Sequence, residues 1–315
     1  MNTNQLIKGI HHVTATVADA QADYDFYTRL LGQRLVKKTV NFDNNQVYHF
    51  YYGNERGEPG TIMTTFPYKG QPVREGVIGT GQVATTVFSV PETAMGFWKN
   101  RLEAAGLDVV SAIRLGRPVL QFCDPSGLQL EITGNHEDPR APWTTAEIGQ
   151  ETAIRGIYTV VLLVEEGRPT LDFLVQEFGF KKVAEEGAVT RFAAVGGGAG
   201  QYVDVQVNPA APRGLNGIGT VHHVAWRVES DAALLAMRRR LADDLECKVT
   251  EVKDRNYFHS IYFRMPGHVL FEIATIPPGF AIDESPDALG LELKLPPWEE
   301  VHRQQIERAL PKINL

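Results

Sequence analysis

The feature that most constrains the fold is a short strand-like pattern that recurs four times along the chain. The pattern reads HVTATV from His12, QVATTV from Gln82, TVVLLV from Thr159 and HVAWRV from His223, and each copy ends in valine at its sixth position. Recurrence of one pattern along a chain indicates a repeated supersecondary unit, which cannot bury its apolar face alone. The chain is therefore expected to contain four copies of one module.

Each copy of the pattern is followed by a helical stretch and then by short β-rich segments. Apolar residues recur at helical spacing in the four stretches, which span residues 19–31, 92–105, 169–178 and 231–241. Turns containing proline then precede a last strand in three copies. Counting six residues on from each proline gives Thr65, Glu131 and Glu272, and the equivalent position of the third copy falls near Val205. The interval is 49 residues both from Gln82 to Glu131 and from His223 to Glu272. We therefore predict duplicated βαβββ modules.

A single βαβββ module leaves a concave face and a sheet edge unpaired, so modules are expected to pair. The expected fold class is α+β, with four modules forming two domains. A polar, proline-containing stretch at residues 134–149 is the expected boundary. It predicts an N-terminal domain at residues 1–140 and a C-terminal domain at residues 150–276. A proline-rich tail at residues 277–315 follows, with a short helix near residues 299–310.

Two positions of each module are expected to face the same concavity. One is the first residue of the opening pattern, and the other is the last-strand residue six positions after the proline. In modules one and four these positions supply His12, His223 and Glu272, whereas modules two and three supply no histidine. A buried glutamate needs a charge partner, and a divalent metal is a strong one. Two histidines and one carboxylate are typical of non-heme Fe(II) oxygenases. We therefore expect module one to pair with module four, and module two with module three.

Other arrangements are open at this point. Sequential pairing would join His12, Gln82 and Glu131, a set that suits a harder octahedral metal. A single histidine in a strand is more often structural than a ligand. Glu131 also lies between apolar residues without an evident histidine, with Gln121 and Gln129 as neighbours that can satisfy it.

Further polar residues lie beside the expected ligands. The stretch 254–262 contains Arg255, which can neutralise an anionic substrate oxygen, and Tyr262, which can donate a phenol hydrogen bond. His11 and His222 precede the expected ligands by one residue. In an ideal strand they would point to the opposite face, which favours packing or support of the ligands.

Charge and cysteine content exclude several functional classes. The net charge of −7 disfavours nucleic acid and anionic membranes as partners. The two cysteines are far apart and lack CxxC spacing, which disfavours a thiolate zinc site or a disulfide framework and fits the cytoplasm. We expect no signal peptide, because residues 1–5 provide no basic region followed by an apolar one. We expect no membrane span, because no apolar run approaches about 20 residues. The sequence leaves the oligomeric state open, including a homo-oligomer.

At these residues the chain resembles the vicinal-oxygen-chelate superfamily of glyoxalases, bleomycin-resistance proteins and extradiol dioxygenases. It is most similar to the hydroquinone ring-cleaving dioxygenases and to related bacterial quinone-detoxification proteins. Residues 9–14, 222–226, 254–263 and 266–275 carry the resemblance. It implies that His12, His223 and Glu272 bind Fe(II), with Mn(II), Zn(II) or Ni(II) as replacements in preparations. It also implies pocket roles that are assigned as follows: His222 as acid/base, Tyr262 and Arg255 as substrate-orienting donors, and His11 and Thr14 as substrate-binding residues.

The resemblance predicts an Fe(II) dioxygenase that inserts O2 into the ring of a hydroquinone. Its partners would be a small aromatic substrate and O2. Two alternatives remain, a glyoxalase-type isomerase or thiol transferase using another metal, and a metal-free protein that binds aromatic drugs.

Overall fold

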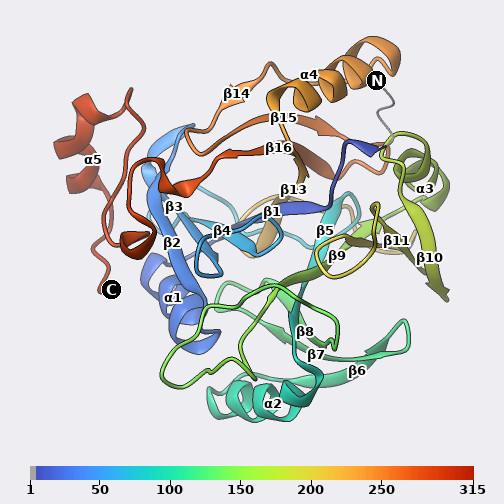
Figure 1. The fold of residues 1–315 in the computed structure, drawn as a ribbon, viewed down its shortest axis with the longest axis horizontal. Helices are drawn as coiled ribbons and strands as arrows, with labels where there is room; N and C mark the ends of the chain where they lie inside the picture. Colours follow the sequence, from blue (N-terminus) through green and yellow to red (C-terminus); the bar gives the residue numbers. More distant parts are fainter. Residues whose placement is uncertain (1–4) are drawn as a thin grey trace.

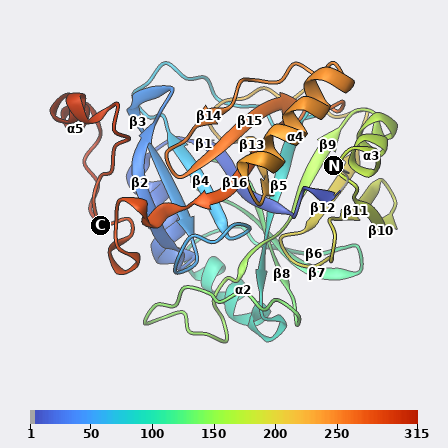
Figure 2. The ribbon, with the colours of Figure 1, turned by 45° about the horizontal axis from the view of Figure 1, so that its top comes forward.

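The computed structural model describes residues 5–315, which form two curled β-sheets with helices at the periphery (Figures 1 and 2). Within these residues each sheet has eight strands. The first sheet has the order β14-β15-β16-β13-β1-β4-β3-β2, and the second has the order β10-β11-β12-β9-β5-β8-β7-β6. The α+β fold class is therefore as predicted.

The first sheet combines strands from the first and fourth modules. Its strands are β1 (Ile10–Val17), β2 (Arg34–Asn41), β3 (Asn44–Gly53), β4 (Ile62–Pro67), β13 (Thr220–Val228), β14 (Lys253–Asp254), β15 (Phe258–Arg264) and β16 (Leu270–Pro278). The two modules join where β1 runs antiparallel to β13. Within each module the first and last strands are parallel, β1 with β4 and β13 with β16.

The second sheet combines the two middle modules in the same way. Its strands are β5 (Gln82–Val90), β6 (Val110–Arg114), β7 (Arg117–Cys123), β8 (Gln129–Gly134), β9 (Gly156–Val164), β10 (Lys181–Glu186), β11 (Val189–Ala193) and β12 (Tyr202–Val207). Strand β5 runs antiparallel to β9 at the junction. This topology is consistent with the expected pairing of module one with four and two with three. Each sheet therefore draws strands from both sides of the predicted boundary at residues 134–149.

One helical element follows the first strand of each module, close to the predicted ranges. These elements are α1 (Ala20–Asp25) with a π-helical turn (Phe26–Leu30), α2 (Met95–Ala104), α3 (Gly167–Gln176) and α4 (Asp231–Arg239) with a π-helical turn (Arg240–Asp244). Side chains cap two of the N-termini: Asp19 accepts hydrogen bonds from the amides of Gln21 and Ala22, and Ser230 accepts one from Ala233. No helix within residues 5–315 has the length and apolarity that crossing a bilayer requires.

A bulge in each junction strand determines which side chains reach the concave face. In the β1–β13 pair, Ile10 faces Trp226 but His12 faces Ala225, so His11 is an extra residue. Thr14 faces His223 and Ala15 faces Val221, so His222 is the extra residue of β13. A bulge disrupts the alternation of side chains between the two faces. The expectation that His222 points away from the site is therefore wrong, because it assumed an ideal strand.

The register also corrects three of the assigned repeat positions. On β16, Glu272 pairs with Ala225, which lies two residues after His223 on β13. The residues that pair with the equivalent positions of β1, β5 and β9 are Thr64, Glu131 and Asp204. Thr64 and Asp204 thus replace the predicted Thr65 and Val205. In the first sheet, His12 pairs with Ala225, two residues after His223. In the second sheet, Thr85 pairs with Val161, two residues after Thr159. Thr85, not Gln82, is therefore the β5 residue equivalent to the histidines His12 and His223. The sequence TTVFSV from Thr85 also ends in valine at its sixth position, so the shared interval of 49 residues was a coincidence.

The tail after β16 packs back on the first sheet, where α5 (Arg303–Ala309) lies beside β3 (Figure 1). The buried ammonium of Lys37 on β2 donates to Asp283 at 2.6 Å and also contacts Glu284. Leu293 forms a parallel bridge with Lys38 at the edge strand β2. The tail therefore covers an otherwise open sheet edge.

Candidate metal centre

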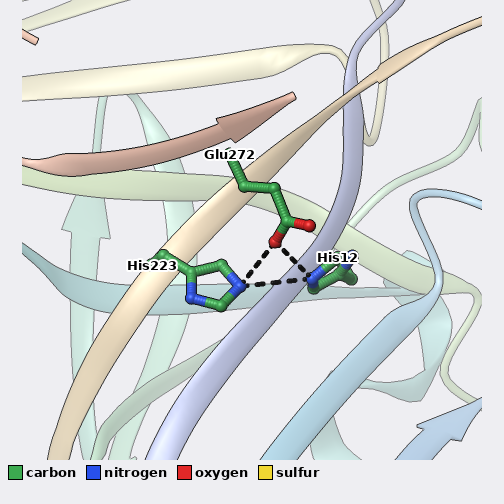
Figure 3. A group of neighbouring side chains, drawn as sticks. All are labelled: His12, His223 and Glu272. Atoms are coloured by element: carbon green, nitrogen blue, oxygen red, sulfur yellow. Dashed lines mark hydrogen bonds and ion pairs between the residues drawn. The ribbon is translucent and has the colours of Figure 1, made fainter. Parts of the chain in front are cut away.

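Three side chains from three strands converge on the concave face of the first sheet. His12 on β1, His223 on β13 and Glu272 on β16 point toward one another (Figure 3). The distances are 3.2 Å from His12 Nε2 to Glu272 Oε2, 2.8 Å from His223 Nε2 to the same oxygen, and 3.3 Å between the two Nε2 atoms. With metal–ligand bonds of about 2.1 Å, neighbouring ligand atoms lie about 3.0 to 3.4 Å apart. The three atoms thus have the spacing of one metal's ligands.

The first histidine of each doublet supports the second. Nδ1 of His11 lies 2.9 Å from Nδ1 of His12, and Nδ1 of His222 lies 2.8 Å from Nδ1 of His223. One nitrogen of each pair must carry the proton. When His12 and His223 donate through Nδ1, both Nε2 atoms keep a free lone pair directed at the centre. A hydrogen-bond partner on the far nitrogen is the usual way to orient a metal-binding histidine.

The protonation states suit a cation. Burial lowers the pKa of His223, although Glu272 opposes this effect, so the imidazole is neutral near pH 7. Burial would raise the pKa of Glu272, but the imidazoles of His12 and His223 outweigh it and hold the pKa well below its usual range. Glu272 Oε2 is buried and has no hydrogen-bond donor among residues 5–315. The buried carboxylate is therefore charged and favours positive charge beside it, which a divalent metal ion would supply.

The other oxygen of Glu272 is held by a chain of polar contacts. The Tyr262 hydroxyl donates to Glu272 Oε1 at 2.9 Å, Arg255 Nε donates to the Tyr262 oxygen at 3.2 Å, and Arg255 also pairs with Asp43 at 3.0 Å. Burial, followed by the charge of Glu272, raises the pKa of Tyr262 above its usual range. Tyr262 was predicted to donate to the substrate, whereas here its proton is directed at the ligand carboxylate.

These residues lie at a cavity of about 230 Å³. The cavity is lined by His12, Asn41, Phe42, Asp43, His49, Tyr51, Phe66, Tyr68, His222, His223, Arg255, Phe258, Tyr262 and Glu272. Asp43 and Arg255 meet although β2 and β14 are the two edges of the sheet, so the sheet curls far enough to close around the cavity.

Sequence reasoning missed the wall that β2, β3 and β4 contribute. His49, Tyr51 and Phe66 belong to it, and the sequence predicted only that short β-rich segments follow each helical stretch. The alternation of His49 and Tyr51 along one strand was a usable signal, because alternate residues share a face.

Two predicted substrate-binding residues are not among those lining the cavity. His11 is buried behind His12 and packs on Phe258 at a ring-centroid distance of 5.0 Å. Thr14 accepts a hydrogen bond at 2.8 Å from the hydroxyl of Thr64. Neither side chain therefore borders the cavity directly. His222 does line the cavity, and burial followed by the charge of His223 lowers its pKa to about 3.

The equivalent positions of the second sheet are filled by ion pairs. Arg114 donates to both oxygens of Glu131 at 2.8 and 2.6 Å, and Gln121 donates to Glu131 at 2.8 Å. Arg191 donates to both oxygens of Asp204 at 2.6 and 2.7 Å. These guanidinium groups provide the positive charge that a metal would provide in the first sheet.

Gln82 lies apart from both sets, and its amide donates to Asn216 at 3.0 Å. Since Glu131 is already neutralised by Arg114, neither residue joins His12. The ligand set that sequential module pairing would give does not form in this structure.

Comparison with known proteins gives consistent similarities. The model of the Glyoxalase/Bleomycin resistance protein/Dioxygenase superfamily matches residues 9–132. MhqO of Bacillus subtilis (strain 168), named as a candidate ring-cleaving dioxygenase, is 46% identical over 96% of this chain and 95% of its own. A chlorohydroquinone/hydroquinone 1,2-dioxygenase of Sphingobium indicum is 34% identical over 98% of both chains. The crystal structure of a candidate dioxygenase from Bacillus subtilis superposes with a TM-score of 0.94 at 45% identity, covering 98% of each chain.

Proposed function

The chain belongs to the Glyoxalase/Bleomycin resistance protein/Dioxygenase superfamily, and from that membership we propose that it is an Fe(II)-dependent dioxygenase that cleaves the ring of hydroquinones. The observation that carries the proposal is the convergence of His12, His223 and Glu272 at an aromatic-lined cavity. The relative that acts on chlorohydroquinone and hydroquinone supports the substrate class. The cysteine content still favours a cytoplasmic location, which we keep as a prediction.

The ligand set supports iron in particular. Two imidazoles and one carboxylate on one side of a metal leave positions open, and this arrangement is typical of non-heme Fe(II) oxygenases. Bound there, Fe(II) would supply those positions to a substrate oxygen and to O2. The residues in place to hold it are His12, His223 and Glu272.

The cavity supports a substrate with a single ring. An engineered apolar cavity of about 150 Å³ accommodates benzene, so about 230 Å³ leaves room for a ring with hydroxyl groups. Phe42, Phe66 and Phe258 provide apolar contacts for the ring. The guanidinium of Arg255 provides positive charge beside the open side of the centre, where a phenolic oxygen would become anionic.

We assign the remaining roles from position. His222 lies in the cavity wall beside the ligand His223. When its Nδ1 accepts the proton of His223, its Nε2–H remains as a donor, so we assign His222 the acid role of donating to a substrate oxygen. Tyr262 donates to the carboxylate of Glu272, Arg255 donates to Tyr262, and both side chains border the space for the substrate. A cavity of this size would hold a single ring in a restricted orientation beside the centre.

The test compares para- and ortho-diols. A catechol can occupy two metal positions and so orients itself, whereas a hydroquinone offers the metal one oxygen and depends on protein groups for its angle. Protein purified without oxygen and loaded with Fe(II) should consume O2 faster with methylhydroquinone than with catechol. Metal analysis of the same sample should give one iron per chain.

Two outcomes would contradict the proposal. A clear preference for catechol would indicate an ortho-diol dioxygenase. The absence of iron-dependent O2 uptake with either diol would leave an isomerase or a binding protein as the better description.

A further inference from the structure

His49 is the imidazole of the cavity wall that belongs neither to the centre nor to its two supporting histidines. It lies on β3, and the sheet order places β4 between β3 and the ligand strand β1. Arg255 and Tyr262 come from the other end of the sheet. A molecule in the cavity therefore lies between His49 on one side and Arg255 with Tyr262 on the other.

The surroundings of His49 fix its ring. The imidazole contacts Tyr51 and Phe66 at ring-centroid distances of 4.0 and 4.3 Å. Its Nε2 lies 2.9 Å from Thr64 Oγ1. Because Thr64 donates its own proton to Thr14, the Thr64 oxygen acts as acceptor for His49 Nε2–H. This assignment leaves Nδ1 of His49 as a bare acceptor.

Nδ1 has no hydrogen-bond partner among residues 5–315, and His49 keeps partial exposure to the cavity. Burial, followed by the charge of His12, holds the pKa of His49 well below its usual range, so the ring stays neutral. An acceptor without a protein partner at the cavity wall is available to a hydrogen-bond donor on a bound molecule.

The first and fourth modules are related by pseudo-symmetry within the sheet, but only the first module carries this imidazole. Tyr262 faces Glu272 on β16, and Tyr51 faces Thr64 on β4, so the two tyrosines occupy equivalent positions. Two residues earlier, the fourth module has Ser260 and the first module has His49. The duplicated modules thus share the tyrosine but not the imidazole.

We infer that His49 binds the ring hydroxyl that does not reach the metal, accepting its hydrogen bond at Nδ1. This inference rests on the proposed function, which places one hydroxyl of a single-ring diol at the centre. Para-diols direct their second O–H away from the metal, so an acceptor on the β3 wall of the cavity would select for them and against ring compounds that lack that proton.

The experiment measures anaerobic binding of two probes to metal-loaded protein by calorimetry. Hydroquinone carries a proton on the second oxygen, and 4-methoxyphenol carries a methyl group there. One hydrogen bond contributes about 0.5–1.5 kcal/mol, so the wild-type protein should bind hydroquinone roughly 2- to 13-fold more tightly than 4-methoxyphenol. His49→Phe should weaken hydroquinone binding by a similar factor and bring the ratio of the two affinities close to one.

Two further variants separate this role from a structural one. His49→Asn places an amide oxygen near the position of Nδ1 and should restore part of the preference for hydroquinone. Thr64→Val removes the acceptor that fixes the ring and should reduce the preference with the metal content unchanged. Circular dichroism and metal analysis check that each variant is folded and loaded.

The outcomes distinguish this inference from the proposed function. If His49→Phe keeps the preference, or weakens both probes equally, the role of His49 is overturned while iron-dependent O2 uptake by the wild type still supports the proposed function. If the wild type binds hydroquinone equally well with and without metal, both proposals fail.

Discussion

At the residue scale, the hydroxyl of Tyr262 is the contact most directly tied to the centre, because it donates to Glu272. Tyr262→Phe should lower metal affinity by about 10- to 100-fold, the usual effect of removing a group that supports a ligand. Competition with a metal-binding dye measures this affinity. Tyr51→Phe is the matched control, since Tyr51 occupies the equivalent position and its hydroxyl forms no hydrogen bond within residues 5–315.

Equal metal affinity in wild type and Tyr262→Phe would contradict this assignment. Tyr262 would then act on the substrate, as the sequence alone suggested. A loss in Tyr51→Phe as large as that in Tyr262→Phe would instead indicate a general effect of the cavity wall.

Asp23 on α1 should give the stability of the protein a distinct pH dependence. Burial raises its pKa from 3.8 to about 8, and hydrogen bonds from Thr65 and Tyr52 only partly oppose this. Between about pH 4 and pH 8 the folded chain keeps this proton and the unfolded chain loses it. The free energy of unfolding should therefore fall as the pH rises through this window.

Asp23→Asn should remove that slope and be the more stable protein at pH 8, by on the order of a few kcal/mol. Urea unfolding at pH 5 and pH 8 measures the difference. Asp25→Asn, on the same helix but with a side chain 38% exposed, should leave the slope unchanged. A larger stability of the wild type than of Asp23→Asn at pH 8 would show that the buried carboxylate is stabilised in its charged form.

Among the secondary-structure elements, the bulged strands β1 and β13 explain which features of the fold could be predicted from the sequence and which could not. The repeat pattern located the opening strands, the helical stretches and the three residues that converge on the concave face. It could not give the bulges, because a bulge adds one residue to a strand without a distinctive residue type. The orientation of His222 and the equivalence of Thr85 to His223 therefore emerged only with the strand register.

The C-terminal segment, residues 277–315, is predicted to influence substrate affinity from outside the cavity. Trp298 packs on Phe42 at a ring-centroid distance of 5.6 Å, and Phe42 lines the cavity. An aromatic pair of this kind contributes about 0.5–1.5 kcal/mol. Trp298→Ala should therefore raise KM for hydroquinone about 2- to 10-fold with kcat and metal content unchanged.

Leu291→Ala is the control for this prediction, because its side chain is 62% exposed on the same segment. It should leave KM unchanged. A wild-type KM in Trp298→Ala would show that Phe42 is held without the tail.

In the whole molecule, the two sheets share one architecture, but different side chains surround their buried carboxylates. Glu272 faces two imidazoles, whereas Glu131 and Asp204 are each held by an arginine. The sequence predicted which modules carry the histidines, and hence which sheet holds the centre. It did not predict Arg114 or Arg191, because both lie on other strands than their partners and only the folded sheet brings them together.

This difference predicts one metal per chain, bound by the first sheet alone. Glu272→Gln should reduce the bound metal to near zero, and Glu131→Gln should retain one metal per chain, as measured by elemental analysis. Glu131→Gln should instead lose on the order of 1–3 kcal/mol of stability, because Arg114 loses its charged partner. Added metal should raise the melting temperature of wild type and of Glu131→Gln but not of Glu272→Gln, since only a chain with the site gains from binding. Two metals per wild-type chain, or equal metal loss in the two variants, would show that the arginine-filled sheet also binds metal.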